Sequence, residues 1–133
     1  MKSRLCTAVV LAACGLMPGP QAEADGTTER VALLGCIRQN DPLPALEKYV
    51  ALNADLHLWL GDNVYADAKE DAQVIQRCYE TLSKKPGFRQ LRSQGQHMAT
   101  WDDHDFGTND SGRHYPLKRQ SQTLFVDFWQ LQD

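Results

Sequence analysis

RVALLGCIRQNDPLPALEKYVALNADLHLWLGD, residues 30–62, contains the pattern that decides the fold. Residues 30–36 form a short apolar run that ends in glycine and cysteine, which is typical of a buried strand. Residues 43–53 place apolar side chains at helical spacing. Residues 55–60 are apolar at alternate positions or better. A strand, a helix and a strand in this order predict a βαβ unit whose two strands run parallel.

The chain beyond this unit continues the same alternation. Residues 71–84 have an apolar helical face, residues 88–94 predict a short helix, and residues 96–101 predict a third strand. A loop rich in Asn, Asp, Ser and Gly covers residues 108–116, and residues 117–131 predict an amphipathic helix. The sequence therefore predicts an α/β domain built from parallel βαβ units.

The first 24 residues have the pattern of an export signal. A basic start is followed by an uncharged apolar run, Leu5 to Met17, which is shorter than the roughly 20 residues that span a bilayer. Cleavage after A-E-A would leave a domain of residues 25–133 in the periplasm or outside the cell. The sequence L-A-A-C ending at Cys14 also resembles a lipobox, whose acylation would anchor the protein to a membrane. We favour simple export, and we expect membrane association only if Cys14 is lipidated.

The composition excludes some classes of protein. The 133 residues include 14 Lys and Arg against 17 Asp and Glu, a net charge of -3, which excludes a basic nucleic-acid binder and a polybasic membrane patch. An apolar fraction of 42% and a charged fraction of 23% are ordinary for a globular domain. We expect a monomer. In an oxidising compartment Cys36 and Cys78 could also form a disulfide.

Each predicted strand ends in side chains that can hold a metal ion. The first ends at Cys36, the second at Asp62 with Tyr65 close behind, and the third leads into D-D-H-D, residues 102–105. Ligands of open parallel sheets bind outside the carboxyl ends of the strands, so neighbouring strands would bring these groups together. Cations would relieve the repulsion among the carboxylates. Carboxylate and phenol oxygens suit hard ions, whereas thiolate and imidazole suit softer ones, which indicates more than one ion.

Structural interpretations compete with this one. An acidic cluster in a polar loop is often only a solvated turn, and Tyr65 alone would be a packing aromatic. His57 alternates with leucines and is expected to be a hydrogen-bonded histidine of the sheet. His97 and His114 stand in no motif and stay unassigned.

Four segments together resemble a known family. They are R-V-A-L-L-G-C-I-R-Q, A-D-L-H-L-W-L-G-D-N-V-Y-A-D, A-T-W-D-D-H-D-F-G-T-N-D-S-G and K-R-Q-S-Q-T-L-F-V-D-F-W, within residues 30–129. In this order they resemble the amino-terminal half of the catalytic domain of the PhoD-like alkaline phosphatase D family, which belongs to the calcineurin-like metallophosphoesterases. The resemblance implies the first half of an αββα sandwich and an exported hydrolase of phosphate esters, of the alkaline phosphatase or phosphodiesterase type. It also implies Fe³⁺ and Ca²⁺ as cofactors and a metal-activated hydroxide that attacks phosphorus.

The resemblance assigns metal ligands position by position. Asp62 in G-D-x-x-Y is similar to the carboxylate that bridges two metals. Tyr65 is similar to the tyrosine that ligates ferric iron in purple acid phosphatases. Cys36 matches a ligand on the iron side, and Asp103 stands where the wider superfamily has a metal-binding asparagine.

The same resemblance assigns catalytic and supporting roles. His104 is similar to the histidine that faces the phosphate and protonates the leaving group, and Asp105 would orient its imidazole. Asn63 and Asn109 would contact the phosphate or support the metal ligands.

The sequence departs from the family at its later blocks. Members of the family supply further histidines from later sequence blocks, one of which is a G-H-x-H motif. His114, in R-H-Y-P, is the one histidine after His104, and it matches none of these later blocks. We therefore expect the chain to be the front part of a larger domain, with an uncovered sheet face. The alternative is a secreted noncatalytic fragment that binds cations but cannot complete a two-metal site.

Overall fold

The computed structural model describes residues 30–131, so the predicted export signal and Cys14 lie outside the described residues. Three strands, β1 (Val31–Leu34), β2 (Leu56–Leu60) and β3 (Gln96–Thr100), form a parallel sheet in the order β1-β2-β3. The expected parallel α/β class is confirmed.

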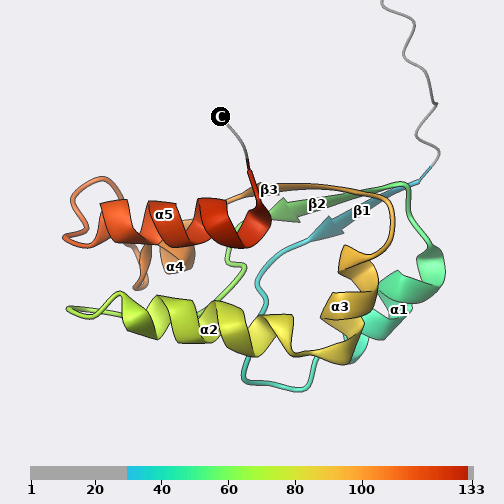
Figure 1. Cartoon of the computed structure of the whole chain (residues 1–133), viewed down its shortest axis with the longest axis horizontal. Helices are drawn as coiled ribbons and strands as arrows, with labels where there is room; N and C mark the ends of the chain where they lie inside the picture. The colour runs from blue at the N-terminus through green and yellow to red at the C-terminus, as the bar shows by residue number, and fades with distance from the viewer. Residues whose placement is uncertain (1–29, 132–133) are drawn as a thin grey trace, which may run out of the picture.

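Within residues 30–131, five helices accompany this sheet, and Figure 1 shows their arrangement. Helix α1 (Pro44–Leu52) connects β1 to β2, and α2 (Gln73–Ser83) with α3 (Pro86–Arg92) connects β2 to β3. Helices α4 (Asp103–Phe106) and α5 (Lys118–Trp129) follow β3. All predicted strands and helices are present with ends within two residues of the prediction, and α4 is the helix that was not predicted. Within the described part of the chain, no helix is both long and apolar enough to cross a membrane.

The helices α1, α2 and α3 lie on one side of the sheet (Figure 1). The strand order explains this arrangement, because each crossover moves to the next strand in the same direction. Parallel crossovers are almost always right-handed, so two successive crossovers in one direction place their helices on the same face.

The core lies between this face and the helices. Trp59 of β2 is 1% exposed and packs against Trp129 of α5, with ring centroids 5.0 Å apart, and against Phe88 of α3 at 5.4 Å. Alternate strand residues point inward, so Ala32 and Leu34 of β1 are also buried. Burying large aromatic side chains in this way stabilises the domain, because it removes apolar surface from contact with water.

The opposite face of the sheet is apolar and exposed. Val31 and Leu33 of β1 are 50% and 54% exposed, Leu60 of β2 is 53% exposed, and Met98 of β3 is 61% exposed. Parallel sheets are normally covered on both faces. Residues 30–131 cover one face and leave the other open.

Two histidines occupy neighbouring positions in the buried face. His57 is 0% exposed and stacks on its cross-strand partner His97, with ring centroids 4.7 Å apart. The expected burial of His57 is confirmed. Its ring nitrogens make no hydrogen bond of normal geometry within the described part of the chain, and the Gln96 backbone is the polar group that acts on its pKa against burial. His97 accepts a hydrogen bond from Trp59 Nε1 at Nδ1 (3.0 Å), which leaves the proton on Nε2 beside the Leu91 and Gln94 carbonyls.

Candidate metal centre

The loops after β1 and β2 run side by side. The Cys36 N–H donates to the Gly61 carbonyl (3.3 Å) and the Ile37 N–H donates to the Asp62 carbonyl (2.8 Å). These bonds extend the parallel pairing beyond the strands, and they hold Cys36 and Asp62 at the same edge of the sheet.

Gly61 lets the end of β2 approach the end of β3. Its φ is +100°, and a Cβ at this position would lie 2.7 Å from the Asp102 Cβ, so a side chain there would force the loops apart. Cys36 and Asp62 themselves have φ values of 54° and 52°. Residues other than glycine rarely adopt the left-handed region, and such strain concentrates at functional sites.

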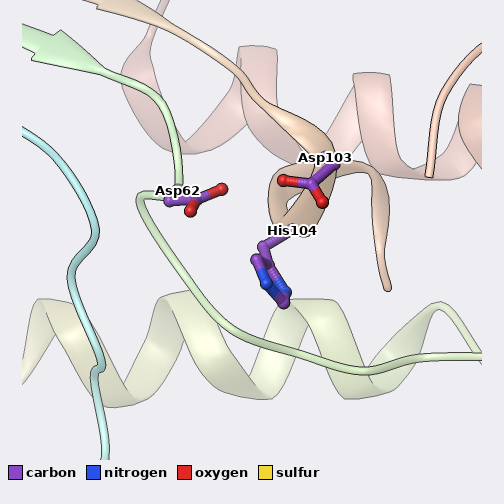
Figure 2. A group of neighbouring side chains, drawn as sticks. All are labelled: Asp62, Asp103 and His104. Carbon is purple, nitrogen blue, oxygen red and sulfur yellow. The ribbon is translucent and has the colours of Figure 1, made fainter. Parts of the chain in front are cut away.

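Asp62, Asp103 and His104 form a compact group. Their potential ligand atoms all lie within 4.8 Å of one another. Figure 2 shows the carboxylates of Asp62 and Asp103 facing each other, with the His104 ring beside them. Asp62 comes from the loop after β2, whereas Asp103 and His104 begin α4, so the group depends on the close approach at Gly61.

Two further predicted ligands contact Asp62. The Tyr65 hydroxyl donates to Asp62 Oδ2 at 2.8 Å, and Cys36 Sγ lies 3.7 Å from the same oxygen. The structure therefore brings the four predicted metal ligands, Cys36, Asp62, Tyr65 and Asp103, together with the predicted proton donor His104. Cys36 and Cys78 are both free thiols, so the disulfide alternative is wrong for this structure.

The group fits a metal ion because two of its buried polar atoms have no hydrogen-bond partner in the described part of the chain. Asp62 Oδ1 and His104 Nδ1 are buried without a hydrogen bond within residues 30–131. Buried polar atoms in proteins are nearly always paired, and a bound ion is one explanation for exceptions. A carboxylate pair with an imidazole, a phenol and a thiol is a donor set for transition metals as well as for hard ions.

The surroundings shift two pKa values at the centre in opposite directions. Burial and the hydrogen bond to Asp62 raise the pKa of Tyr65, so the phenol keeps its proton when no cation competes for the oxygen. The backbone N–H of Asp110 donates to Asp103 and lowers the pKa of that carboxyl. Asp103 is therefore held as a carboxylate, the form that a metal ligand requires.

The Asp105 carboxylate, predicted to orient His104, accepts hydrogen bonds from other residues. This carboxylate is 0% exposed and accepts hydrogen bonds from Asn63 N (3.0 Å), Asn63 Nδ2 (3.3 Å), Asp102 N (3.0 Å) and the Tyr79 hydroxyl (3.3 Å). It points into the core behind the centre, where it connects the loop after β2 to the start of α4. No hydrogen bond joins Asp105 to His104 within residues 30–131, so the orienting role stays a prediction from the resemblance.

A different acid lies beside the His104 ring. Asp67 Oδ1 is 3.9 Å from His104 Nδ1, and the Tyr65 ring centroid is 4.1 Å from the His104 centroid. The imidazole is only 13% exposed, so these neighbours fix its position. Asp67 stands in Y-A-D directly after the motif that contains Tyr65, but nothing in that sequence separates it from other exposed acids.

The two predicted asparagines have different positions. Asn63 is buried, and its Nδ2 also donates to the Thr100 carbonyl (2.9 Å), so it supports the loop that carries Asp62. Asn109 is exposed and donates to Asp110 (2.6 Å), so no described contact places it in the group.

Gln39 is a supporting residue that the sequence did not indicate. It is 1% exposed, its Nε2 donates to the Tyr65 carbonyl (2.9 Å), and its Oε1 accepts from the Tyr65 N–H (2.9 Å). This paired contact fixes the backbone of Tyr65. The available signal was its alternation with buried Ile37, which points Gln39 inward.

Comparisons with protein-family models, with curated proteins and with solved structures found no match to this chain. The resemblance to PhoD-like phosphatases stays a prediction from the sequence motifs.

Proposed function

We propose that this chain contributes a metal-binding centre to an exported hydrolase of phosphate esters, as the resemblance to PhoD-like phosphatases implies. The observation that carries the proposal is the meeting of Asp62, Asp103 and His104 within 4.8 Å, with buried polar atoms that have no hydrogen-bond partner within residues 30–131. Asp62 and Asp103 would hold the ion, with Tyr65 and Cys36 as further ligands on the side of Asp62.

The proposed chemistry divides between the ion and the chain. A bound ion, Fe³⁺ or Ca²⁺ by resemblance, would lower the pKa of a bound water and neutralise negative charge on the phosphate. His104 would carry the proton for the departing alcohol, because its ring lies at the carboxylate pair and is held by Tyr65 and Asp67. Asp62 and Asp103 would fix the electrostatic centre toward which the phosphate is drawn.

The open sheet face supports the fold that belongs to this proposal. In an αββα sandwich, a second sheet packs on the face opposite the helices, and such an interface needs apolar side chains. The exposed Val31, Leu33, Leu60 and Met98 provide that kind of surface.

One observation favours a second candidate, a cation-binding chain without turnover. His104 is the one histidine in the ligand group of the described residues, because His57 and His97 belong to the core and His114 accepts from Arg113 (2.9 Å). Two ions would need imidazole or carboxylate ligands beyond this group.

The test is metal binding followed by hydrolysis. The chain would be stripped with a chelator and titrated separately with Mn²⁺, Ca²⁺ and Fe³⁺, by calorimetry or by electron paramagnetic resonance for Mn²⁺. Hydrolysis of p-nitrophenyl phosphate and its bis ester would then be measured. We expect Asp62→Asn to weaken metal binding at least tenfold and His104→Gln to lower kcat by about 10²–10⁴ where hydrolysis occurs.

Asp127→Asn is the matched control, because Asp127 is an exposed carboxylate of α5 outside the ligand group. Equal metal affinity in the wild type and Asp62→Asn would exclude the centre. Metal binding without hydrolysis would favour the noncatalytic candidate.

A further inference from the structure

Arg38 lies beside the candidate metal centre, on a backbone segment that hydrogen bonds hold in place. Its two neighbours are both hydrogen-bonded to the loop that carries Asp62 and Tyr65: the Ile37 N–H donates to the Asp62 carbonyl (2.8 Å), and Gln39 pairs with the Tyr65 backbone at 2.9 Å in both directions. Ile37 and Gln39 are 5% and 1% exposed, whereas Arg38 is exposed. The alternation therefore turns Arg38 outward, while its backbone stays in register with the metal ligands.

The guanidinium group of Arg38 rests on the Tyr65 ring. Its Cζ is 4.5 Å from the ring centroid, and the hydroxyl of the same ring donates to Asp62. Stacking on an aromatic face holds a guanidinium in place and leaves its N–H donors at the edge of the plane available. The cation therefore contacts one proposed metal ligand, Tyr65, and is separated from Asp62 by that side chain.

Arg38 has no carboxylate partner in the described part of the chain. The ion pairs there are Arg77 with Asp71 and His104 with Asp67, and no hydrogen bond from the Arg38 guanidinium is formed within residues 30–131. It lines a polar hollow of about 180 Å³, together with Gln39, Asn40, Asp41, Tyr65 and Asp67. The guanidinium therefore has N–H donors available for an anionic ligand beside the candidate centre.

We propose that Arg38 is a substrate-binding residue that takes the nonbridging oxygens of a phosphate group at the metal centre. This inference rests on the proposed function for the identity of the anion. A planar guanidinium donates two parallel hydrogen bonds to phosphate, which a lysine ammonium cannot reproduce. Arg38 also supplies positive charge where Asp62, Asp67 and Asp103 would otherwise repel an anionic substrate.

Inorganic phosphate is the probe that tests this inference without requiring catalysis. Its affinity would be measured by ³¹P NMR titration of the metal-free chain and of the Mn²⁺-loaded chain. We expect Arg38→Ala to weaken phosphate binding about tenfold to a hundredfold in both forms, as for a lost hydrogen bond to a charged group. Arg38→Lys would recover part of this loss, because it keeps the charge and loses the paired geometry.

Arg92→Lys and Arg92→Ala are the matched controls, because Arg92 stacks on Trp129 at 5.0 Å and belongs to α3. They should leave phosphate affinity within twofold of the wild type. Where the chain hydrolyses p-nitrophenyl phosphate, Arg38→Ala should raise KM more than it lowers kcat. A purely structural role for Arg38 would change the melting temperature and leave phosphate affinity in place.

The outcomes separate this inference from the proposed function. Phosphate affinity of Arg38→Ala within twofold of the wild type, or no phosphate binding by the wild type in either form, would overturn the inference. Arg38-dependent phosphate binding in a chain that binds no metal would overturn the proposed function and retain an anion site at Arg38.

Discussion

At the scale of single residues, Asp105 holds together the two loops that form the candidate centre. Its buried carboxylate accepts from Asn63, Asp102 and Tyr79, which belong to three different segments. Burial raises the pKa of Asp105 to about 6 despite these donors. Burying a carboxylate here costs free energy of desolvation. In return, its two oxygens accept more hydrogen bonds than a neutral side chain of the same size could accept.

Asp105→Asn is therefore expected to destabilise the fold. The amide offers one acceptor oxygen and turns an NH₂ group toward backbone donors, so at least one buried donor loses its partner. We expect the free energy of unfolding to fall by roughly 2–3 kcal/mol. Urea denaturation followed by circular dichroism measures this change, with Asp127→Asn as the exposed control that should stay within about 0.5 kcal/mol of the wild type. Equal stability of the wild type and Asp105→Asn would show that these contacts do not hold the loops.

At the scale of secondary structure, periodic segments were predictable and the short helix α4 was not. Strands β1 and β2 have apolar residues at strand spacing, and α2 has a clear apolar face, so tertiary packing and local pattern agree there. Helix α4 spans only Asp103–Phe106, too short for periodicity, and its D-D-H-D sequence has the composition of a loop. Its one local signal is the capping box. In this motif the Asp102 side chain accepts from the backbone N–H of Asp105, and the Asp105 side chain accepts from the backbone N–H of Asp102.

The candidate centre also had features that the sequence could predict and features that it could not. The ligand types at the strand ends were predictable, because parallel strands deliver their carboxyl ends to one edge. The roles of Asp105, Gln39 and Arg38 were not, since each depends on which backbone donor, carbonyl or ring lies opposite in space. Sequence spacing identifies the edge of the sheet but does not specify those neighbours.

The stacked histidines His57 and His97 of β2 and β3 should make stability depend on pH. Burial lowers the pKa of both imidazoles from the usual 6.5. The unfolded chain then binds protons more readily than the folded chain, so stability is full above pH 6.5 and falls as the pH drops toward the lowered values. Each histidine contributes up to about 1.4 kcal/mol per pH unit in that window. The raised pKa of Asp105, about 6, has the opposite effect, because the folded chain binds that proton more readily than the unfolded chain. Protonation of Asp105 below pH 6 therefore offsets part of the loss of stability.

Urea unfolding between pH 7.5 and 5.5 measures this dependence. The wild type should lose stability on acidification from pH 6.5, and His57→Leu should lose less, because a leucine side chain cannot take up a proton. His114→Gln is the control, since His114 is exposed. The assignment to the buried pair fails if His57→Leu and the wild type have the same pH dependence.

At the scale of the whole molecule, residues 30–131 cover the parallel sheet on one face only. Two crossovers in the same direction place α1, α2 and α3 together (Figure 1), and the second face keeps apolar residues on each strand. An apolar surface of this kind drives association with other apolar surfaces. The unpaired edges of β1 and β3 add backbone groups that can pair with another chain.

In place of the monomer expected from the sequence, we therefore expect residues 30–131 to self-associate through this face and to bind an apolar dye. The double variant Leu33→Thr, Met98→Thr should do both less. Threonine keeps strand propensity while replacing side chains that are 54% and 61% exposed, so stability should change little. Leu34→Thr is the matched control on the covered face, where Leu34 is 4% exposed and the same change should cost about 2 kcal/mol or more. Sedimentation velocity and anilinonaphthalene sulfonate fluorescence provide the two readouts. A monomeric wild type without dye binding would mean that this sheet face does not drive the association that its exposure indicates.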